Sequence, residues 1–561
     1  MIGRAGFSSK CWRVLRWAGL AAAAPALWAC TSRTLETPTI TPTANLTTTF
    51  TQKINNELDL LFMIDNSSSM SEMQKKIYDQ LPNFIGKLQG LPTPPSLHVA
   101  VVSSDLGAPG DAQSSIGCTA FGDQGLFQSA PRSDSTQNPP VVCTDSTLAV
   151  PMGAPNNDNT FISDADNMPN YTQTGTDPIA TVFQCIALLG SAGCGFEHQL
   201  ASIETALGAV NLQPGQTPNP PSTNNGFLRP EAYLGIVMLT NEDDCSATPP
   251  TQLYSLNVGG SNQQNIANAL GPIQNYRCNQ WGHLCTEPGG NVEMPPLQPP
   301  ANAMSNEGLP TLDMTNCMSN DTGSGLLTPV SQFINDIKAL KTSPDTQILV
   351  ASISAPPTPY TVEWIPESQG QNTQPGELWP QIQHSCGAKG GDDVNPEITD
   401  PTQNPTDGSF GDPGVRIAQF VNAFKNSVLA SICDSDYGAS MNAIATKLGQ
   451  LITPPCITGL LQQDSQGQPL CSVVENLTDS SNVMKHIALQ NCAETTNTTQ
   501  CWKLVAPAAG SSCNGVQLSV TDTVNVNPNS QDSDIDCSIC LPGAAIAGCP
   551  CVAGNMVPGC I

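Results

Sequence analysis

Five short apolar runs, each ending in a polar turn, constrain the fold of this chain more than any other feature of its sequence. Apolar runs this short and this continuous are typical of parallel strands that are buried on both faces of a sheet. We therefore predict strands at Leu58–Ile64, Leu97–Ser103, Tyr233–Leu239, Gln347–Ile353 and Val428–Ile432.

Apolar residues at helical spacing lie between and after these runs. The stripes run from Ile77 to Leu88, where Pro82 should kink or split the helix, from Phe196 to Val210, from Phe333 to Leu340 and from Met441 to Leu451. Strands that alternate with amphipathic helices predict an α/β fold with a doubly wound, mostly parallel sheet, over residues 56–455. In such a sheet, ligands bind beyond the carboxyl ends of the strands.

Three long polar stretches interrupt this pattern, at about residues 106–178, 246–327 and 355–412. Loops of such length are rarely structureless in a compact domain, so we expect surface insertions held by disulfides. After residue 455 the helical periodicity fades and cysteines become denser. We predict a separate, small, cysteine-rich β module over residues 456–561.

The N-terminus reads as a targeting segment. Residues 1–29 have a basic start, an apolar core and a final small residue, as a signal peptide does. Leu27–Cys30 resembles the lipobox of bacterial lipoproteins, which implies acylation of Cys30 and a place in the cell envelope, at the outer membrane. An ordinary secretory signal with an incidental cysteine remains the alternative. Residues 30–55, rich in Thr and Pro, are expected to form an extended tether.

Cysteine usage fits export. Of 22 cysteines, setting aside Cys11 and Cys30 leaves 20, an even number that predicts disulfides in an oxidising compartment. Two pairs close in sequence are plausible partners, namely Cys185 with Cys194 and Cys278 with Cys285. The pair Cys537 and Cys540 has zinc-like spacing, but no histidine accompanies it, so disulfides are the preferred interpretation there as well.

The charge balance excludes some partners. Asp and Glu outnumber Lys and Arg by 47 to 20, which gives a net charge of −27. Such a surface repels nucleic acid and anionic lipid headgroups and attracts divalent cations, so membrane contact is expected through the lipid anchor only. Acidity that merely keeps an exported protein soluble is an equally good reading of the charge.

The first predicted strand ends in Asp65-Asn66-Ser67-Ser68-Ser69. Alternate side chains of a loop that leaves a strand can converge, and here they offer a carboxylate and two hydroxyls, hard oxygen ligands suited to Mg²⁺, Mn²⁺ or Ca²⁺. This Asp-x-Ser-x-Ser motif resembles the metal-ion-dependent adhesion site of von Willebrand factor A domains. The resemblance implies that Ser67 and Ser69 touch the metal and that Asp65 acts largely through water.

Two further positions of that family's site depart from the pattern. Thr240-Asn241-Glu242 stands where the family has Thr-Asp-Gly, so Asn241 brings no charge, and Asp243 and Asp244 are expected to compensate. No threonine lies near residues 193–197, where Ser191 or Glu197 could substitute. The predicted metal set is Asp65, Ser67, Ser69, Asn241 and Asp243, with Glu197 as a further candidate. A metal-free scaffold remains open.

Other phrases add to the resemblance. Gly193–Glu197, Phe227–Ala232 and Asn241–Ser246 resemble a group of large, cysteine-rich bacterial lipoproteins built on this domain. That likeness implies the fold more than it implies a function.

Enzyme signatures are missing from the sequence. It has no His-Glu-x-x-His, no Gly-x-Ser-x-Gly and no P-loop. Glu197-His198 is interpreted as a solvated helix edge and Asp105 as a turn residue. We therefore expect no enzyme but a surface protein whose divalent cation captures an acidic side chain of a partner protein. The alternatives are a structural envelope lipoprotein and a metal-assisted hydrolase, for which no general base is suggested.

Overall fold

The computed structural model describes most of the chain after residue 46. The described residues are 47–53, 56–91, 94–108, 118–133, 143, 150, 160–164, 169–171, 177–248, 251–254, 270, 275–306, 309–366, 378–387, 409–452, 456–457, 460–478, 484–497, 499–506, 515–522, 530–540 and 549. Thr48–Gly459 and Cys471–Cys537 belong to one compact unit, while Leu460–Leu470 belongs to another.

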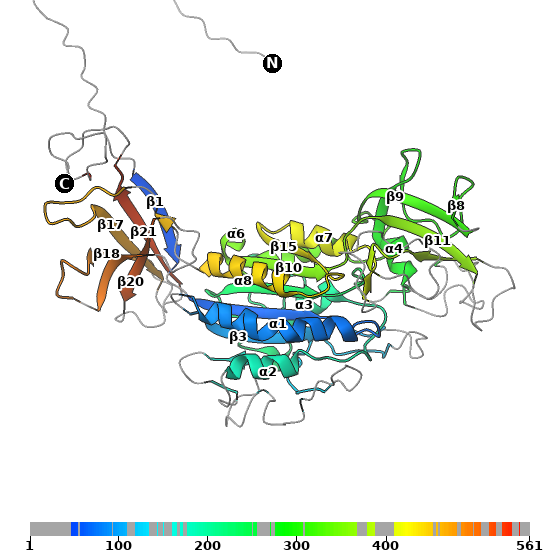
Figure 1. Ribbon diagram of the computed structural model, residues 1–561, viewed down its shortest axis with the longest axis horizontal. Coiled ribbons are helices and arrows are strands. Elements are labelled where there is room, and N and C mark those ends of the chain that lie inside the picture. The colour runs from blue at the N-terminus through cyan, green and yellow to red at the C-terminus, as the bar shows by residue number, and fades with distance from the viewer. Residues whose placement is uncertain are drawn as a thin grey trace, which may run out of the picture. The chain divides into compact units, whose positions relative to one another are not determined.

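A six-stranded sheet forms the centre of the α/β part, in the order β15-β10-β5-β2-β3-β4 (Figure 1). Its strands are β2 (Glu57–Ile64), β3 (Ser96–Ser103), β4 (Ile162–Ser163), β5 (Tyr233–Leu239), β10 (Ile348–Ser354) and β15 (Asn426–Ser431). All pairs are parallel except β3 with β4. The chain therefore winds outward from β2 in both directions, and the predicted doubly wound, mostly parallel sheet is confirmed.

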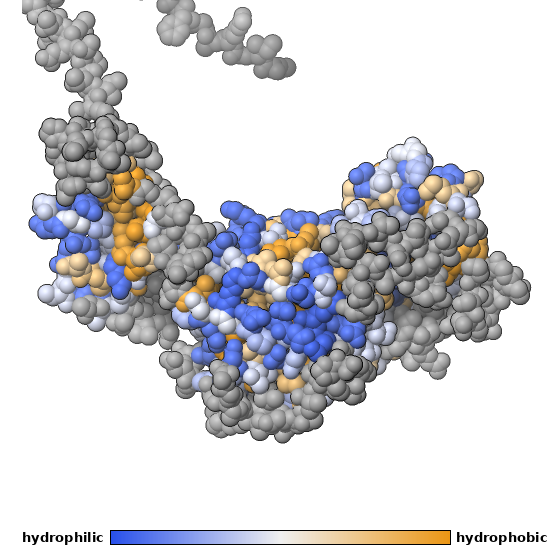
Figure 2. All heavy atoms as spheres, viewed as in Figure 1, coloured by the Kyte–Doolittle hydropathy of each residue, from blue (hydrophilic) through white to orange (hydrophobic). Residues whose placement is uncertain are grey.

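Helices cover both faces of this sheet. On one face lie α1 (Ser71–Gln89), α2 (Pro178–Ile186) and α8 (Gly438–Ile452), and on the other α3 (Gln199–Leu207), α5 (Val330–Ala339) and α7 (Val415–Asn422). Alternate residues of β2 feed the two cores, because successive strand side chains point to opposite faces. Leu60 and Phe62 pack under α1, whereas Leu61 and Met63 pack under α3. The outward side of α1 is mostly hydrophilic (Figure 2).

Two of the predicted helices differ in detail. Pro82 neither splits nor ends α1, which runs through it as one helix. The stripe from Phe196 to Val210 is longer than α3, which ends at Leu207 because Gly208 takes a left-handed conformation with φ 69°. A left-handed glycine satisfies the last carbonyls of a helix and stops it. Phe196 therefore packs in a loop, and Val210 is exposed.

The second and third insertions share one antiparallel sheet, in the order β12-β11-β9-β6-β7 with β8 on β9. The second insertion supplies β6 (His283–Thr286), β7 (Val292–Glu293), β8 (Met304–Asn306) and β9 (Leu309–Ser319), and the third supplies β11 (Tyr360–Pro366) and β12 (Leu378–Ile382). Trp364, Tyr360 and Leu312 lie in its core. Smaller elements are η3 (Ser222–Asn224), α4 (Tyr276–Gly282), α6 (Pro344–Gln347), β13 (Cys386–Gly387) and β14 (Phe410–Gly411).

Disulfides fasten all three insertions, as predicted, but not with the predicted partners. The five bonds of the α/β part are Cys118–Cys194, Cys143–Cys185, Cys245–Cys278, Cys285–Cys317 and Cys386–Cys433. The predicted pairs Cys185 with Cys194 and Cys278 with Cys285 are wrong. Each of these cysteines bonds to one at least 32 residues away, because the fold brings distant loops together.

The described residues of the predicted C-terminal module contain β-strands, and one further strand of their sheet comes from the predicted tether. Its sheet has the order β1-β21-β17-β18-β19-β20-β16. The strands are β1 (Thr47–Lys53), β16 (Cys456–Ile457), β17 (Cys471–Thr478), β18 (Met484–Asn491), β19 (Gln500–Val505), β20 (Val516–Asp522) and β21 (Ser530–Ser538). Part of the predicted tether thus forms β1 beside β21, and it is not an extended linker.

The module's described disulfides are Cys471–Cys537, Cys492–Cys501 and Cys540–Cys549. Cys537 and Cys540 therefore bond to different partners, which supports the disulfide interpretation of that pair over zinc. The predicted signal peptide, Cys30 and the rest of the tether lie outside the described residues. No helix in the described part of the chain is long and apolar enough to cross a membrane.

Candidate functional site

Asp65 joins the carboxyl ends of three neighbouring strands. Its fully buried carboxylate accepts hydrogen bonds from the Ser67 N–H at 2.8 Å, from the Ser104 hydroxyl after β3 at 3.1 Å and from the Thr240 hydroxyl after β5 at 2.8 Å. Burial raises the pKa of Asp65, although these hydrogen bonds oppose the shift. Asp65 thereby fixes the loop that begins directly after β2.

The two predicted metal-binding serines lie on this loop in different surroundings. Ser67 is buried, and its hydroxyl lies close enough to Asp65 to lower the carboxyl pKa, yet Oγ has no hydrogen-bond partner of good geometry. Ser69 is half-buried and donates from Oγ to Oδ1 of Asn241 at 3.1 Å. Asn241 is fully buried, and its Nδ2 has no partner. The structure thus brings Asp65, Ser67, Ser69 and Asn241 together.

Several buried oxygens around this loop lack hydrogen-bond partners. They are Oδ1 of Asn66, Oγ of Ser67, Oε1 of Glu197 and Oε1 of Gln199. Buried acceptors without partners are rare and cost free energy, so a group of them calls for an explanation. Hard cations bind oxygen acceptors of these types, and the donor set therefore fits Mg²⁺ or Ca²⁺.

Glu197 also lies at this site, on the loop before α3, and only 2% of it is exposed. Burial, the charge of Glu242 and the charge of Asp65 raise the pKa of Glu197 well above its usual value. Glu197 and Glu242 are hydrogen-bonded to each other, and burial with neighbouring Asp412 raises the pKa of Glu242 to about 8. Burial and the neighbouring acidic groups therefore disfavour the charged form of both carboxyls.

Glu242 was missed as a site residue in the sequence. Its other contact is with the side-chain amide of Asn275, which comes from the second insertion. The available signal was that Glu242 replaces a glycine of the family motif, and a carboxylate at that place changes the charge of the site. Of the two proposed replacements for the missing threonine, Ser191 is exposed, whereas Glu197 is buried and interacts with Asp65.

Asp243, a predicted metal ligand, instead contacts His283 and the N-terminus of α7. Its Oδ2 accepts from the N–H of Arg416 at 2.8 Å and lies 2.8 Å from Nε2 of His283, and its Oδ1 accepts from the N–H of Ile417 at 3.0 Å. Burial raises the pKa of Asp243, but the hydrogen bonds from His283 and from the start of α7 outweigh burial and lower it. Both oxygens are thus engaged at the N-terminus of α7.

Asp244 does the same for α3. Its Oδ1 accepts from the N–H of Leu200 at 2.9 Å, and its Oδ2 accepts from the fully buried Arg416 guanidinium at 2.9 Å. Acidic side chains at helix N-termini satisfy free N–H groups and favour the helix dipole. The two aspartates predicted to compensate for Asn241 therefore organise two helices.

The interpretation of Glu197-His198 as a solvated helix edge is wrong. Both residues are buried, and Nε2 of His198 lies 2.8 Å from the carbonyl oxygen of Gly107. Asp105 behaves as the predicted turn residue, since its Oδ1 accepts from the N–H of Gly107 at 2.8 Å. Across the described residues, no three His, Cys, Asp or Glu side chains are grouped to hold a metal.

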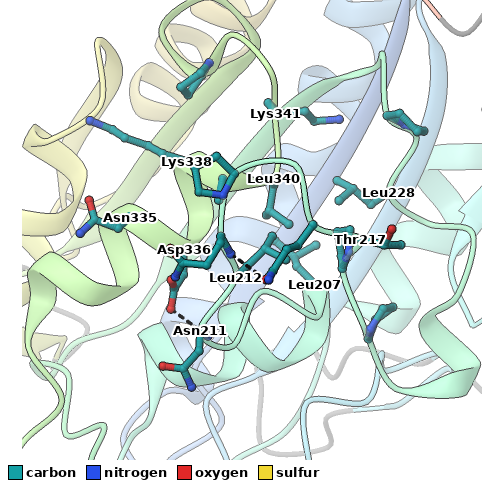
Figure 3. Close-up of a pocket in the computed structure, with 18 of the residues that line it drawn as sticks. Leu207, Asn211, Leu212, Thr217, Leu228, Asn335, Asp336, Lys338, Leu340 and Lys341 are labelled. Atoms are coloured by element: carbon teal, nitrogen blue, oxygen red, sulfur yellow. Dashed lines mark hydrogen bonds between the residues drawn. The ribbon is translucent and has the colours of Figure 1, made fainter. Parts of the chain in front are cut away.

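A groove of 1250 Å³ lies elsewhere, at the amino ends of β5 and β10. Leu207, Leu212 and Leu340 form apolar parts of its lining (Figure 3). Asp336 accepts from the N–H of Asn211 at 3.0 Å on its wall. The groove contains none of the predicted metal-binding residues, so it is separate from the candidate site.

Comparisons with known proteins add structural likeness only. No model of a protein family matches the chain, and no curated protein matches its sequence. Among solved structures, the chain is similar to the pilus adhesin SpaC from Lactobacillus rhamnosus GG in an open conformation, with 10% identity over 87% of this chain and 39% of the adhesin, at a TM-score of 0.28. It is also similar to a von Willebrand factor type A protein from Catenulispora acidiphila, with 8% identity over 88% of this chain and 64% of that one, at a TM-score of 0.26.

The chain thus spans less than two thirds of either structure's length. TM-scores this low do not establish a shared fold. The fold assignment rests on the strand order and register observed in this chain. By that strand order, the chain has a doubly wound α/β fold whose candidate site lies at the carboxyl ends of β2, β3 and β5.

Proposed function

We propose that this protein binds a partner protein through a divalent cation, Mg²⁺ or Ca²⁺, at the loop after β2. Ser67 and Ser69 would hold the cation directly, and Asp65 and Asn241 would hold it through water. The observation that carries the proposal is the buried Ser67 hydroxyl, which lies beside the buried carboxylate of Asp65 but has no hydrogen-bond partner of good geometry. A bound cation would supply an open coordination position for a carboxylate oxygen of the partner.

The chain's own residues prepare the site. Asp65 is held by three donors, so the loop does not have to reorganise on binding. Gln74 ties the same loop to Gly190, accepting from the Gly190 N–H at 3.0 Å while it donates to the Asp65 carbonyl at 2.8 Å.

The proposal also concerns the kind of protein and its cellular location. We propose a binding protein rather than an enzyme, anchored through Cys30 in the cell envelope, at the outer membrane. A net charge of −27 would repel an acidic partner in general, so a cation is needed for local attraction. The insertions, which disulfides fasten near the strand ends, would form the rim that selects the partner.

Calorimetric titration of Mg²⁺, Ca²⁺ and Mn²⁺ into the chain from residue 31 onward, with disulfides formed, tests the proposal. This length keeps β1 in its sheet. Saturable binding should be lost in Ser67→Ala and Ser69→Ala and kept in Ser68→Ala, a matched control because Ser68 is exposed between them. Absence of binding at millimolar cation would refute cation-dependent partner binding and leave the domain as a metal-independent scaffold.

A further inference from the structure

A loop beside the candidate site, Cys118–Leu126, is fastened at many points to the carboxyl end of β3. Asp123 donates its N–H to the Asp105 carbonyl at 2.8 Å, and its carboxylate accepts from the Ser103 hydroxyl at 2.6 Å. The Ala108 N–H donates to the Thr119 carbonyl at 2.7 Å. A disulfide joins the start of the loop to Cys194, so this loop is held on both sides.

The backbone of the loop packs closely against its neighbours at two glycines. Gly122 has φ 51°, and a Cβ there would lie 2.3 Å from Oδ1 of Asp105. A Cβ on Gly125, at φ 68°, would lie 2.8 Å from Cγ2 of Thr205 on α3. These glycines permit contacts that any side chain would block, and the loop is packed directly against its neighbours.

This rigid loop presents Phe121 to solvent. Its side chain is 71% exposed, the highest fraction among the exposed large apolar residues in the described part of the chain. Leu126, at the end of the same loop, is 38% exposed. An exposed aromatic side chain on a rigid backbone loses little conformational entropy on binding, which is why such residues serve as anchors in protein interfaces.

Residues at the carboxyl end of β3 hold both the loop and the candidate site. The Ser104 hydroxyl that donates to Asp65 follows Ser103, which holds Asp123. The carbonyl of Ser104 accepts from the His198 N–H at 2.9 Å, directly after Glu197. Phe121 is therefore presented at the same edge of the sheet as the proposed cation, on a loop that hydrogen bonds and a disulfide fasten there.

We infer that Phe121 is the apolar anchor of the binding surface, and that the partner is a protein with an apolar pocket beside the acidic side chain it offers to the cation. The inference rests on the proposed function, since the acidic side chain needs the cation. It adds the chemistry that selects among acidic partners: the ring recognises the apolar pocket, while the site recognises the carboxylate.

Selection of a phage-displayed library of disulfide-closed random peptides on the chain from residue 31 onward, in Mg²⁺ buffer, tests this inference. Enriched peptides should contain an Asp or Glu with apolar neighbours. Their affinity should fall at least about tenfold in Phe121→Ala and recover in Phe121→Trp. Val210→Ala is the matched control, because Val210 is 53% exposed and lies beyond the other end of α3.

The outcomes separate the two proposals. Peptides whose binding is lost in a chelator but unchanged in Phe121→Ala would overturn the role of Phe121 and keep the cation site. Peptides that ignore the chelator yet need Phe121 would overturn the cation mechanism and, with it, the paired recognition inferred here. No enrichment over a blank surface would overturn both.

Discussion

The carboxylate of Asp243 accepts the backbone N–H of Arg416 at 2.8 Å, although the two residues are 173 positions apart in the chain. This contact fixes the start of α7 against the loop that follows β5. The Arg416 side chain donates a hydrogen bond to Asp244, so one buried arginine contacts two consecutive aspartates. Asp243 caps α7, and Asp244 caps α3. The acidic loop after β5 thereby connects the candidate site to α3 and α7, two of the three helices on one face.

Asp243→Ala should lower stability without weakening cation binding. The change removes a helix cap and leaves Nε2 of the buried His283 without a partner, at a cost of about 2–4 kcal/mol. Denaturant unfolding followed by circular dichroism measures the first effect and calorimetric cation titration the second. Asp243→Asn, which keeps acceptor oxygen, is the milder comparison. Lost cation binding at full stability would instead make Asp243 a ligand.

Gln74→Leu should weaken cation binding about tenfold, because outer groups that orient ligands commonly contribute this much. The Gln74 amide donates to the carbonyls of Asp65 and Gly190 and accepts from the N–H groups of Leu189 and Gly190, so it joins the serine loop to the loop before α3. Calorimetry measures the affinity. Gln80→Leu is the control, because Gln80 is half-buried and lies further along α1, and this variant should leave the affinity unchanged. Equal losses of affinity in the two variants would refute the positioning role of Gln74.

Asp59→Ala should destabilise the α/β part by about 3–5 kcal/mol, because it breaks a buried ion pair and leaves cations behind. Asp59 is fully buried in β2; its carboxylate accepts from the Arg229 Nε at 2.8 Å and lies 3.8 Å from Nζ of Lys341. Chemical unfolding measures the loss. Asp79→Ala, which removes a surface pair with Lys75, should cost at most about 0.5 kcal/mol, and a similar small value for Asp59→Ala would contradict the prediction.

Stability should fall as pH rises from about 5 to 9, in part through Glu204. Burial and the neighbouring Asp336 raise the pKa of Glu204 to about 9 from 4.5, so the folded chain keeps a proton that the unfolded chain releases. Below the unfolded pKa this contribution is complete, and it is lost as pH approaches the folded pKa. Melting temperatures at pH 5, 7 and 9 measure it.

Glu204→Gln should flatten that slope without removing it, because the pKa of Glu242 is also raised, to about 8. The glutamine keeps the size of the side chain and cannot ionise. A slope identical in the variant and the unchanged protein would show that Glu204 does not hold the proton.

Much of the central fold could be predicted because its information is local. Four of the five strands are apolar runs that lie buried on both faces, and such a strand has no other stable place in water. The fifth, β15, is a partly exposed edge strand. The Asp65–Ser69 loop was likewise visible, since the end of a strand and alternate polar residues lie within one short segment. For the same reason Asp65 and Ser67 were found without knowledge of any distant contact.

Residues whose role depends on distant partners could not be predicted in this way. Asp243 and Asp244 are adjacent acids in the sequence and were expected to serve the cation site, but helix N-termini from other parts of the chain take up their oxygens. Glu242 belongs to the candidate site only because the fold brings Glu197 and Asn275 into contact with it. Charge is visible in a sequence, whereas the group that satisfies it is not.

The sequence by itself determined the strands, the helical stripes and the serine loop, because burial and spacing act within a few residues. Only the tertiary structure decided the disulfide partners, the sheet shared by the second and third insertions, and the entry of β1 into the C-terminal sheet. Each of these depends on which edges and sulfurs meet once the core has formed. Pairing is a property of distance in space: Cys278 bonds to Cys245 across 33 residues, while the nearer Cys285 bonds to Cys317.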